Sequence, residues 1–267
     1  MSNDPKEAAL RYASTSAEAF RDNADLVGSL GATEWENATG CAKWDMRALE
    51  GHIVGEAVWF PHLIREVVDG EPPLPGEVWG ELAELPGDDL ASRIRGAADE
   101  LVLNVENASP DDLQKPADLG WMTIPLWQGL FVAVMEGVYH NWDARASRDP
   151  RAAIPTAWAL VLAERMPVMA GFLARQEELQ DAKGRYLLEV GDGVGPVNLK
   201  VDGQVVVEGG SVSSPDATLN LSADQYVRLI VGRFPLGPAI DRGEVSLSGD
   251  RRRAESLNHV FKGIANE

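Results

Sequence analysis

The spacing of apolar residues changes near residue 181 of this 267-residue chain. Before that point, apolar side chains recur at the three- and four-residue spacing of amphipathic helices. After it, they alternate with polar residues in short runs, which is the pattern of half-buried strands. All eight tryptophans precede residue 160, whereas glycines are dense in the last third. We therefore predict an α+β chain of two domains, residues 1–181 and residues 182–267.

Five helical segments are predicted in the first domain. Asp45 is a candidate N-cap for the second of them, and Pro61 is expected to kink that helix or to start a new turn in it. Four long amphipathic helices favour a bundle, and bundles carry metal ligands on the inner faces of their helices. The predicted segments are residues 5–30, 45–68, 88–105, 123–148 and 156–180.

The second domain is predicted to hold a small, mostly antiparallel sheet. Asp202 and Gly203 separate two of its strands and indicate a two-residue hairpin turn. Ser222 and Gly232 flank a predicted helix as its N-cap and its terminal glycine. The strands are predicted at residues 186–191, 197–201, 204–207, 217–221 and 244–248, and a closing helix at residues 250–264.

The chain is strongly acidic, with a formal net charge of −18 and a pI near 4.6. Nucleic acids and anionic membranes are recognised through Lys and Arg, so neither is expected as a partner. No apolar run approaches the roughly 18–20 residues of a membrane span, and the polar N-terminus does not look like a signal peptide. The single cysteine, Cys41, excludes an internal disulfide and predicts a reducing compartment, with the cytoplasm as the expected location.

Glu136 and His140 stand four residues apart in a predicted helix and therefore share one face of it. Burying the Glu136 carboxylate in this apolar run is costly unless a positive group meets it. A divalent cation is the obvious candidate, and His52 on another predicted helix offers a third ligand. Two histidines and one carboxylate leave coordination positions open, which is typical of catalytic metals. The alternative is a buried hydrogen bond between Glu136 and one histidine, with the other histidine unrelated.

Other chemistry-bearing side chains have simpler interpretations. Glu56, one turn beyond His52, is a candidate fourth ligand or base, although such residues more often support the ligands or face solvent. Asp143 could orient the His140 ring or pair with an arginine, and a structural role is expected. The sequence has no Gly-x-Ser-x-Gly elbow and no Gly-rich phosphate loop. An enzyme built from this chain would therefore use a metal-bound water, a cofactor or the substrate as its nucleophile.

Three motifs in this order resemble the mycothiol-dependent maleylpyruvate isomerase family. The first is an aromatic residue, a short spacer and a histidine, matched by Trp44 to His52. The second is Glu-x-x-x-His followed by Trp-Asp, matched by Glu136 to Asp143. The third lies in the second domain, at residues 216–224 and 231–235. The resemblance spans nearly the whole chain and implies a DinB-like four-helix bundle followed by a domain like sterol carrier protein 2.

The resemblance also implies a chemistry. Family members hold a zinc-type metal with two histidines and a glutamate, which here are His52, His140 and Glu136. An arginine of the second domain lies near the active site, and Arg233 is the best match. The nucleophile is the thiol of the cofactor mycothiol, used to isomerise or S-conjugate a small electrophilic substrate. The expected partners are therefore this thiol and that substrate, with a monomer and a homodimer both left open.

Two alternatives remain at this stage. The same donor set holds Fe(II) in oxygenases, although those sites usually lie in β-barrels rather than between helices. The chain could also be a non-catalytic carrier of small molecules or lipids, with a vestigial site in its bundle. The sequence does not distinguish zinc from nickel, manganese or iron.

Overall fold

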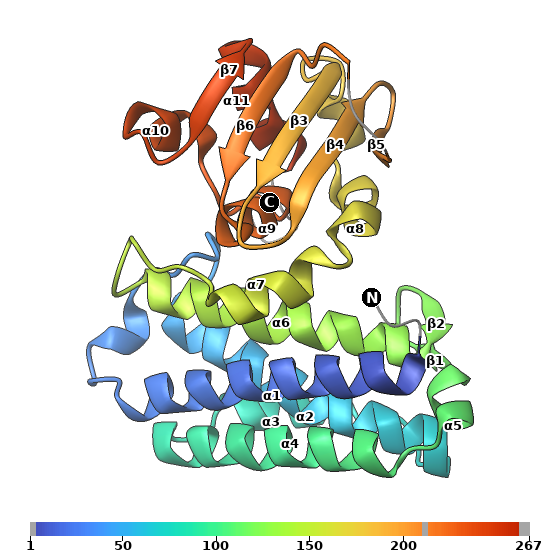
Figure 1. The fold of residues 1–267 in the computed structure, drawn as a ribbon. Helices are drawn as coiled ribbons and strands as arrows, with labels where there is room; N and C mark the ends of the chain where they lie inside the picture. The colour runs from blue at the N-terminus through green and yellow to red at the C-terminus, as the bar shows by residue number, and fades with distance from the viewer. Residues whose placement is uncertain (1–3, 210–212, 262–267) are drawn as a thin grey trace. The chain divides into compact units, whose positions relative to one another are not determined.

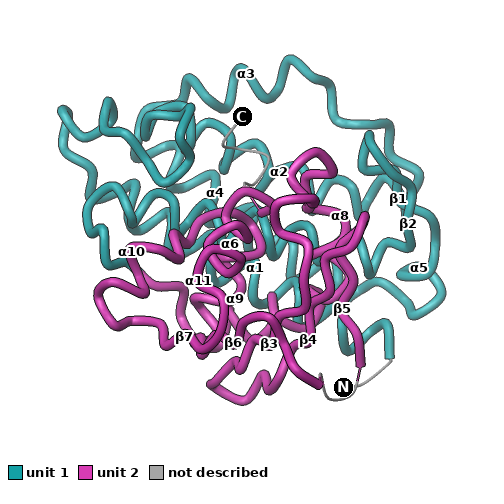
Figure 2. The backbone as a smooth tube through the Cα atoms, turned by 90° about the horizontal axis from the view of Figure 1, so that it is seen from above, with its two compact units in different colours: residues 1–152 teal, residues 153–267 magenta. Residues whose placement is uncertain are grey.

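The four long helices of the first 152 residues lie side by side and form a bundle (Figure 1). The computed structural model describes residues 4–209 and 213–261. The chain divides into two units, residues 1–152 and residues 153–267 (Figure 2). The expected α+β class is confirmed, with the helical bundle first and the sheet second.

The bundle consists of α1 (Pro5–Gly28), α2 (Met46–Asp69), α4 (Gly87–Asn107) and α6 (Leu126–Ala146). Helices α1 and α2 each pack against both α4 and α6. Shorter elements join them: α3 (Glu77–Ala83), α5 (Pro110–Gln114) and the hairpin of β1 (Pro116–Asp118) and β2 (Thr123–Pro125). Large side chains that are fully or almost fully buried fill the interior, among them Tyr12, Phe20, Leu49, Ile53, Phe60, Leu90, Ile94, Leu101, Leu130 and Val134.

Helix α2 follows from local sequence signals. The Asp45 side chain accepts a hydrogen bond from the backbone nitrogen of Ala48 at 2.8 Å, which is the predicted N-cap. The helix continues through Pro61 and ends at Gly70, whose φ of 75° suits glycine. The carbonyl of Pro61 also accepts a hydrogen bond from the Asn104 amide at 3.0 Å, which ties α2 to α4. The proline therefore does not divide the segment into two helices.

The second unit contains a five-stranded sheet in the order β5-β4-β3-β6-β7. Only β3 and β6 pair in parallel, so the sheet is mostly antiparallel, as predicted. Gly203, with a φ of 68°, makes the predicted turn between β4 and β5. The strands are β3 (Gly184–Val190), β4 (Gly195–Val201), β5 (Val205–Glu208), β6 (Ala217–Leu221) and β7 (Ser246–Gly249).

Within the described residues, two helices lie between β6 and β7 along the chain, and one helix follows β7. Helix α9 (Ala223–Ile230) begins with a capping box between Ser222 and Gln225, and α10 (Leu236–Asp241) follows it without having been predicted. Helix α11 (Arg251–Val260) is the described part of the predicted closing helix, whose residues 262–264 lie outside the described residues.

The predicted helix 156–180 is wrong as a single element. The structure has α7 (Thr156–Ala163) and α8 (Met166–Leu173), bent by 71°. Pro167 lies in the first turn of α8, where its missing N–H costs nothing, so it marks a helix start. In the described part of the chain, no single helix is long and apolar enough to cross a membrane, and α7 and α8 reach that length only as a bent pair.

The two units divide earlier than the composition boundary at residue 181. Helix α7 packs on α9, and α8 packs on β5, so both belong with the sheet. The backbone nitrogen of Ile154 donates to Asp224 at 2.8 Å, and that of Arg175 donates to the carbonyl of Val260 at 3.0 Å. The change in tryptophan and glycine content did not indicate the division at residue 152, because α7 and α8 are helical like the bundle although they pack with the sheet.

Candidate metal centre

Three ligand atoms converge where α2 packs against α6. His52 lies on α2, and Glu136 and His140 lie one turn apart on α6. Glu136 Oε2 is 3.1 Å from His52 Nε2 and also 3.1 Å from His140 Nε2. One atom from each of the three residues lies within 4.8 Å of the others. The structure therefore brings together the three residues singled out in the sequence.

This donor set fits a divalent cation. Ligands at about 2.0–2.2 Å from a tetrahedral metal are about 3.3–3.5 Å apart, close to the 3.1 Å between the Glu136 oxygen and each histidine nitrogen. Two imidazoles and one carboxylate are also the donors that zinc and similar metals take at catalytic sites. The side chains of His52 and Glu136 are 24% and 27% exposed, so solvent reaches one side of the cluster.

Asp143 fixes the orientation of one imidazole. Its Oδ2 lies 2.9 Å from His140 Nδ1, and its side chain is fully buried. With the proton of the ring on Nδ1, Nε2 has a lone pair directed toward the cluster. Arg145 pairs with Asp22 instead, with 2.9 Å between Nε and Oδ2. Of the two roles considered for Asp143, the structure favours support of His140.

Burial and charge act in opposite directions on the titratable groups of the cluster. Burial alone would raise the pKa of Glu136, but the hydrogen bonds and charges of His140 and His52 outweigh it and hold that pKa well below its usual value. Burial would lower the pKa of His140, but Asp143 and Glu136 outweigh it and raise that pKa to about 9. In the metal-free protein the cluster thus holds a carboxylate against an imidazolium.

Glu56 lies at the edge of the cluster rather than within it. Its Oε1 is 3.9 Å from His52 Nε2, and it is not part of the convergent group. Burial, followed by the charge of Glu136, raises the pKa of Glu56 well above its usual value. Its 14% exposed side chain lies next to the solvent-reached side of the ligands.

The loop before α2 is pressed against α6. A Cβ on Gly40 would lie 2.7 Å from Asp143 Oδ1 and 2.9 Å from the Trp142 ring, so only glycine fits there. The neighbouring Cys41 is buried, and its sulfur, a ring nitrogen of His140 and a carboxylate oxygen of Asp143 lie within 4.8 Å of one another. The spacing of residues along the chain does not indicate that Cys41 lies close to His140 and Asp143 of α6.

Aromatic side chains border the histidines. The ring of Trp44 is 4.7 Å from that of His52 and 5.6 Å from that of His140, measured between centroids. The ring of Trp79, on α3, is 6.3 Å from that of His52. Trp44 belongs to the motif noted in the sequence, whereas Trp79 was not singled out. Gly55 lies against the Trp79 ring and Gly51 lies against Ala83, and this pair of glycines in α2 is a signal that could have indicated the close approach of α3.

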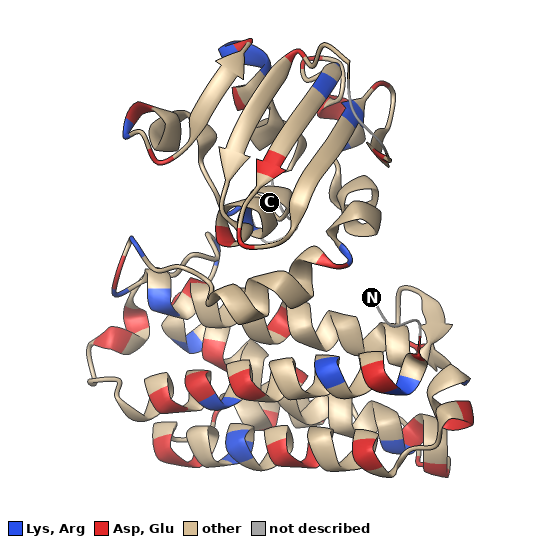
Figure 3. Ribbon diagram, in the orientation of Figure 1, with Lys and Arg blue, Asp and Glu red and all other residues tan. Residues whose placement is uncertain are grey.

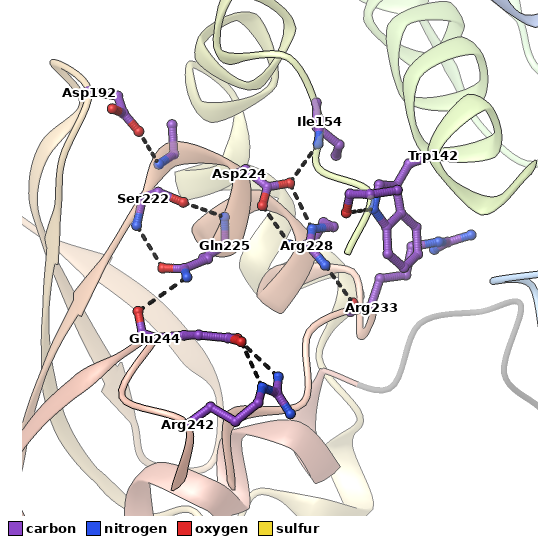
Figure 4. Close-up of polar contacts among 12 residues, drawn as sticks. Trp142, Ile154, Asp192, Ser222, Asp224, Gln225, Arg228, Arg233, Arg242 and Glu244 are labelled. Atoms are coloured by element: carbon purple, nitrogen blue, oxygen red, sulfur yellow. Dashed lines mark hydrogen bonds and ion pairs between the residues drawn. The ribbon is translucent and has the colours of Figure 1, made fainter. Parts of the chain in front are cut away.

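Arg233 lies in the second unit, in the turn that follows α9. Gly232, with a φ of 72°, begins this turn, and the Arg233 nitrogen donates to the carbonyl of Arg228 at 2.8 Å. Arg228 itself forms a bidentate pair with Asp224 (Figure 4). The backbone around Arg233 is therefore held by α9, and the predicted role of its guanidinium stays a prediction.

Comparison with known families agrees with the two-unit architecture. Residues 16–145 match the mycothiol maleylpyruvate isomerase N-terminal domain, and residues 171–262 match the SCP-2 sterol transfer family. The chain belongs to the mycothiol-dependent maleylpyruvate isomerase family. The resemblance of the three sequence motifs to this family is thus confirmed.

Solved structures share the fold of this family member. A crystal structure of the mycothiol-dependent maleylpyruvate isomerase is 16% identical, with a TM-score of 0.57, and the match covers 87% of this chain and 92% of that one. A crystal structure of a histidine-to-alanine mutant of that isomerase is also 16% identical, with a TM-score of 0.54 and the same coverage. At this identity the likeness establishes the fold. No curated protein sequence matches the chain.

Proposed function

We propose that this family member is a metal-dependent enzyme that uses a low-molecular-weight thiol, mycothiol in the first instance, on a small electrophilic substrate. The reaction is isomerisation of the maleylpyruvate type or S-conjugation. The observation that carries the proposal is the convergence of His52, Glu136 and His140, with one side of the cluster reached by solvent. A divalent cation at that point, zinc in the first instance, would lower the pKa of a thiol in an open coordination position and hold it as the thiolate.

The residues of the chain then have separate tasks. His52 and His140 supply neutral nitrogen donors, and Glu136 brings one negative charge close to the cation. Asp143 keeps the His140 ring in place through the 2.9 Å contact with Nδ1. Glu56, 3.9 Å from His52 Nε2, would hydrogen-bond to a group in an open coordination position.

The second unit is proposed to contribute the guanidinium of Arg233. Arginine binds carboxylates through two parallel hydrogen bonds, which suits a substrate or cofactor that carries a carboxylate. The chain has a formal net charge of −18, and Asp and Glu are spread over the helices of the bundle (Figure 3), so a local positive group is needed to bind such an anion. We also propose that the enzyme works in the cytoplasm, where a small thiol and Cys41 both stay reduced.

Metal analysis of the purified protein tests this function. Wild type is expected to bind one divalent cation per chain and to require an added thiol for turnover of maleylpyruvate. His52→Ala should lose the metal and the turnover, whereas His62→Ala should keep both. His62 lies on the same helix, but its Nε2 is 2.8 Å from the carbonyl oxygen of Pro72 and takes no part in the cluster. Equal metal in wild type and His52→Ala would contradict the proposal.

The same preparation distinguishes the two chemistries that this donor set allows. An Fe(II)-loaded sample is tested for oxygen consumption with and without the thiol. We expect no thiol-independent oxygen uptake above the level of His52→Ala. Oxygen consumption that depends on Fe(II) and on His52 would favour an oxygenase instead.

A further inference from the structure

The two histidines of the cluster are held in different ways. His140 Nδ1 faces the buried Asp143 carboxylate at 2.9 Å. Among the residues that the structure describes, none is hydrogen-bonded to Nδ1 of His52. Two indoles pack near the His52 ring instead: Trp44 at 4.7 Å with an interplanar angle of 46°, and Trp79 at 6.3 Å with an angle of 36°. Apart from the 3.1 Å contact of Nε2 with Glu136, the described surroundings that can orient the His52 ring are therefore these two indoles.

The position of Trp79 is determined by the surface of α2. A Cβ on Gly55 would lie 2.1 Å from a ring carbon of Trp79, and one on Gly51 would lie 2.9 Å from Cβ of Ala83. The two glycines stand one turn apart and let the short helix α3 approach α2 closely. Glycine is unfavourable inside a helix, so these two glycines lower the local stability of α2 but allow the close approach of α3.

Helix α3 is short, and the segments that flank it are hydrogen-bonded to α2 through Leu85 and Pro72. It has seven residues, and its only buried side chain in the described structure is Leu82. The segment before it, residues 72–76, contains three prolines and is not helical. Within α3 itself, Trp79 lies against Gly55 and Ala83 lies against Gly51, and these two glycines are three residues from His52 or closer along α2.

We propose that Trp79, seated on Gly55, is a positioning residue for His52. The indole limits rotation of the His52 ring and so keeps Nε2 directed at Glu136. Trp79 contributes no ligand atom, and its effect passes through the orientation of the histidine. The inference rests on the proposed metal function and adds to it a residue outside the family motifs noted in the sequence. Groups that orient metal ligands typically change metal affinity by about 10–100-fold when they are removed.

The test is the affinity and the visible absorption spectrum of bound Co(II), a spectroscopic substitute for zinc. Trp79→Ala is expected to raise the dissociation constant of Co(II) by about 10-fold or more and to alter the ligand-field bands. Trp79→Phe should retain most of the affinity for Co(II), because an aromatic ring still lies against Gly55. Trp59→Ala is the matched control. Trp59 lies on α2 and is partly exposed, and its ring contact is with Phe60 at 4.8 Å.

A double-mutant cycle with Gly55 separates this role from general damage to the fold. Gly55→Ala should weaken Co(II) binding in the wild-type background, because the new Cβ displaces Trp79. In the Trp79→Ala background the same change should have little further effect, because the ring it would displace is gone. Gly80→Ala is the control for replacing a helical glycine by alanine, since no other group lies within 4 Å of a Cβ added there.

The outcomes separate this inference from the proposed function. Failure of wild type to bind Co(II) would overturn the metal function. Tight binding by wild type with an unchanged dissociation constant in Trp79→Ala would overturn the role of Trp79 alone. Should Trp79→Ala unfold at the assay temperature, Trp79→Leu replaces it, since it keeps apolar volume on Gly55 without a ring. A folded Trp79→Leu with wild-type Co(II) affinity would likewise overturn the inference.

Discussion

Asn23 of α1 and Glu50 of α2 form a buried pair in the bundle, with 2.6 Å between Asn23 Nδ2 and Glu50 Oε2. Both residues are essentially inaccessible to solvent. Within the described residues, Glu50 Oε1 and Asn23 Oδ1 have no hydrogen-bond partner. A protonated Glu50 has a hydroxyl to donate, and Asn23 Oδ1 is an acceptor without a donor. Burial raises the pKa of Glu50 to about 8, in keeping with a neutral carboxylic acid at neutral pH.

This pair predicts a pH dependence of stability. The pKa of Glu50 is about 8 in the folded state against 4.5 for the free group, so its contribution is complete below pH 4.5 and is lost as the pH rises toward 8. Glu50→Gln should therefore resemble wild type near pH 5 and be more stable at pH 9, by on the order of 2–4 kcal/mol. Urea unfolding at pH 5, 7 and 9 measures the difference. Glu66→Gln, on the same helix, controls for the loss of one charge, and parallel pH profiles for wild type and Glu50→Gln would contradict the prediction.

Metal binding is expected to release a proton. The neighbouring carboxylates raise the pKa of His140 to about 9, so the metal-free ring is protonated at pH 7 and must lose that proton to become a ligand. Metal affinity should accordingly rise with pH up to about 9. Calorimetric titration with Zn(II) at pH 7, in buffers of different ionisation enthalpy, should give about one proton released per metal. Binding heats that do not vary with the buffer would show that His140 is already neutral.

Asp143→Asn is predicted to weaken the metal site without unfolding the bundle. The amide has the size of the carboxylate but cannot favour a proton on His140 Nδ1, so the ring loses its fixed orientation. We expect Zn(II) affinity to fall by about 10–100-fold, and the pKa of His140 to fall as well. Asp22→Asn is the comparison, because Asp22 of α1 pairs with Arg145 of α6 but does not contact the ligands. Equal losses of affinity in the two variants would assign the effect to the fold.

Much of this architecture could be predicted because its determinants are local. The four-residue spacing places Glu136 and His140 on one face of α6, and the apolar run around them predicts a helix that is buried over most of its surface. Asp45 and Ser222 begin their helices as predicted, since an N-cap needs only the residues that follow it. Such signals are complete within about one helical turn.

Features that depend on distant contacts could not be predicted in this way. Asn23 contacts Glu50 only because α1 and α2 lie in one bundle. Neither residue type predicts the other from the sequence. The position of Trp79 depends on Gly55 of α2, and a glycine inside a helix by itself indicates only lower helix stability. The break between α7 and α8 depends on packing against α9 and β5, and Pro167 alone could equally have kinked one helix.

The last prediction concerns Asp224, which joins two parts of the second unit. Its carboxylate accepts the Ile154 N–H at 2.8 Å and pairs with Arg228 through contacts of 2.7 and 2.5 Å (Figure 4). The side chains of Arg228 and Asp224 are only 12% and 14% exposed, so removal of one charge leaves the other largely buried. Breaking such a pair typically costs about 3–5 kcal/mol.

Two substitutions distinguish the contacts of Asp224. Asp224→Asn keeps an oxygen for the Ile154 N–H but leaves Arg228 without its charged partner, whereas Asp224→Ala removes both interactions. Hydrogen exchange should therefore accelerate at residues 231–233 in both variants, because Arg228 is hydrogen-bonded to the backbone of Arg233. It should accelerate at Ile154 mainly in Asp224→Ala. Glu255→Ala, which breaks the exposed pair with Arg251, should leave both segments unchanged. Identical exchange at Ile154 in the Asn and Ala variants would mean that the carboxylate does not hold this segment.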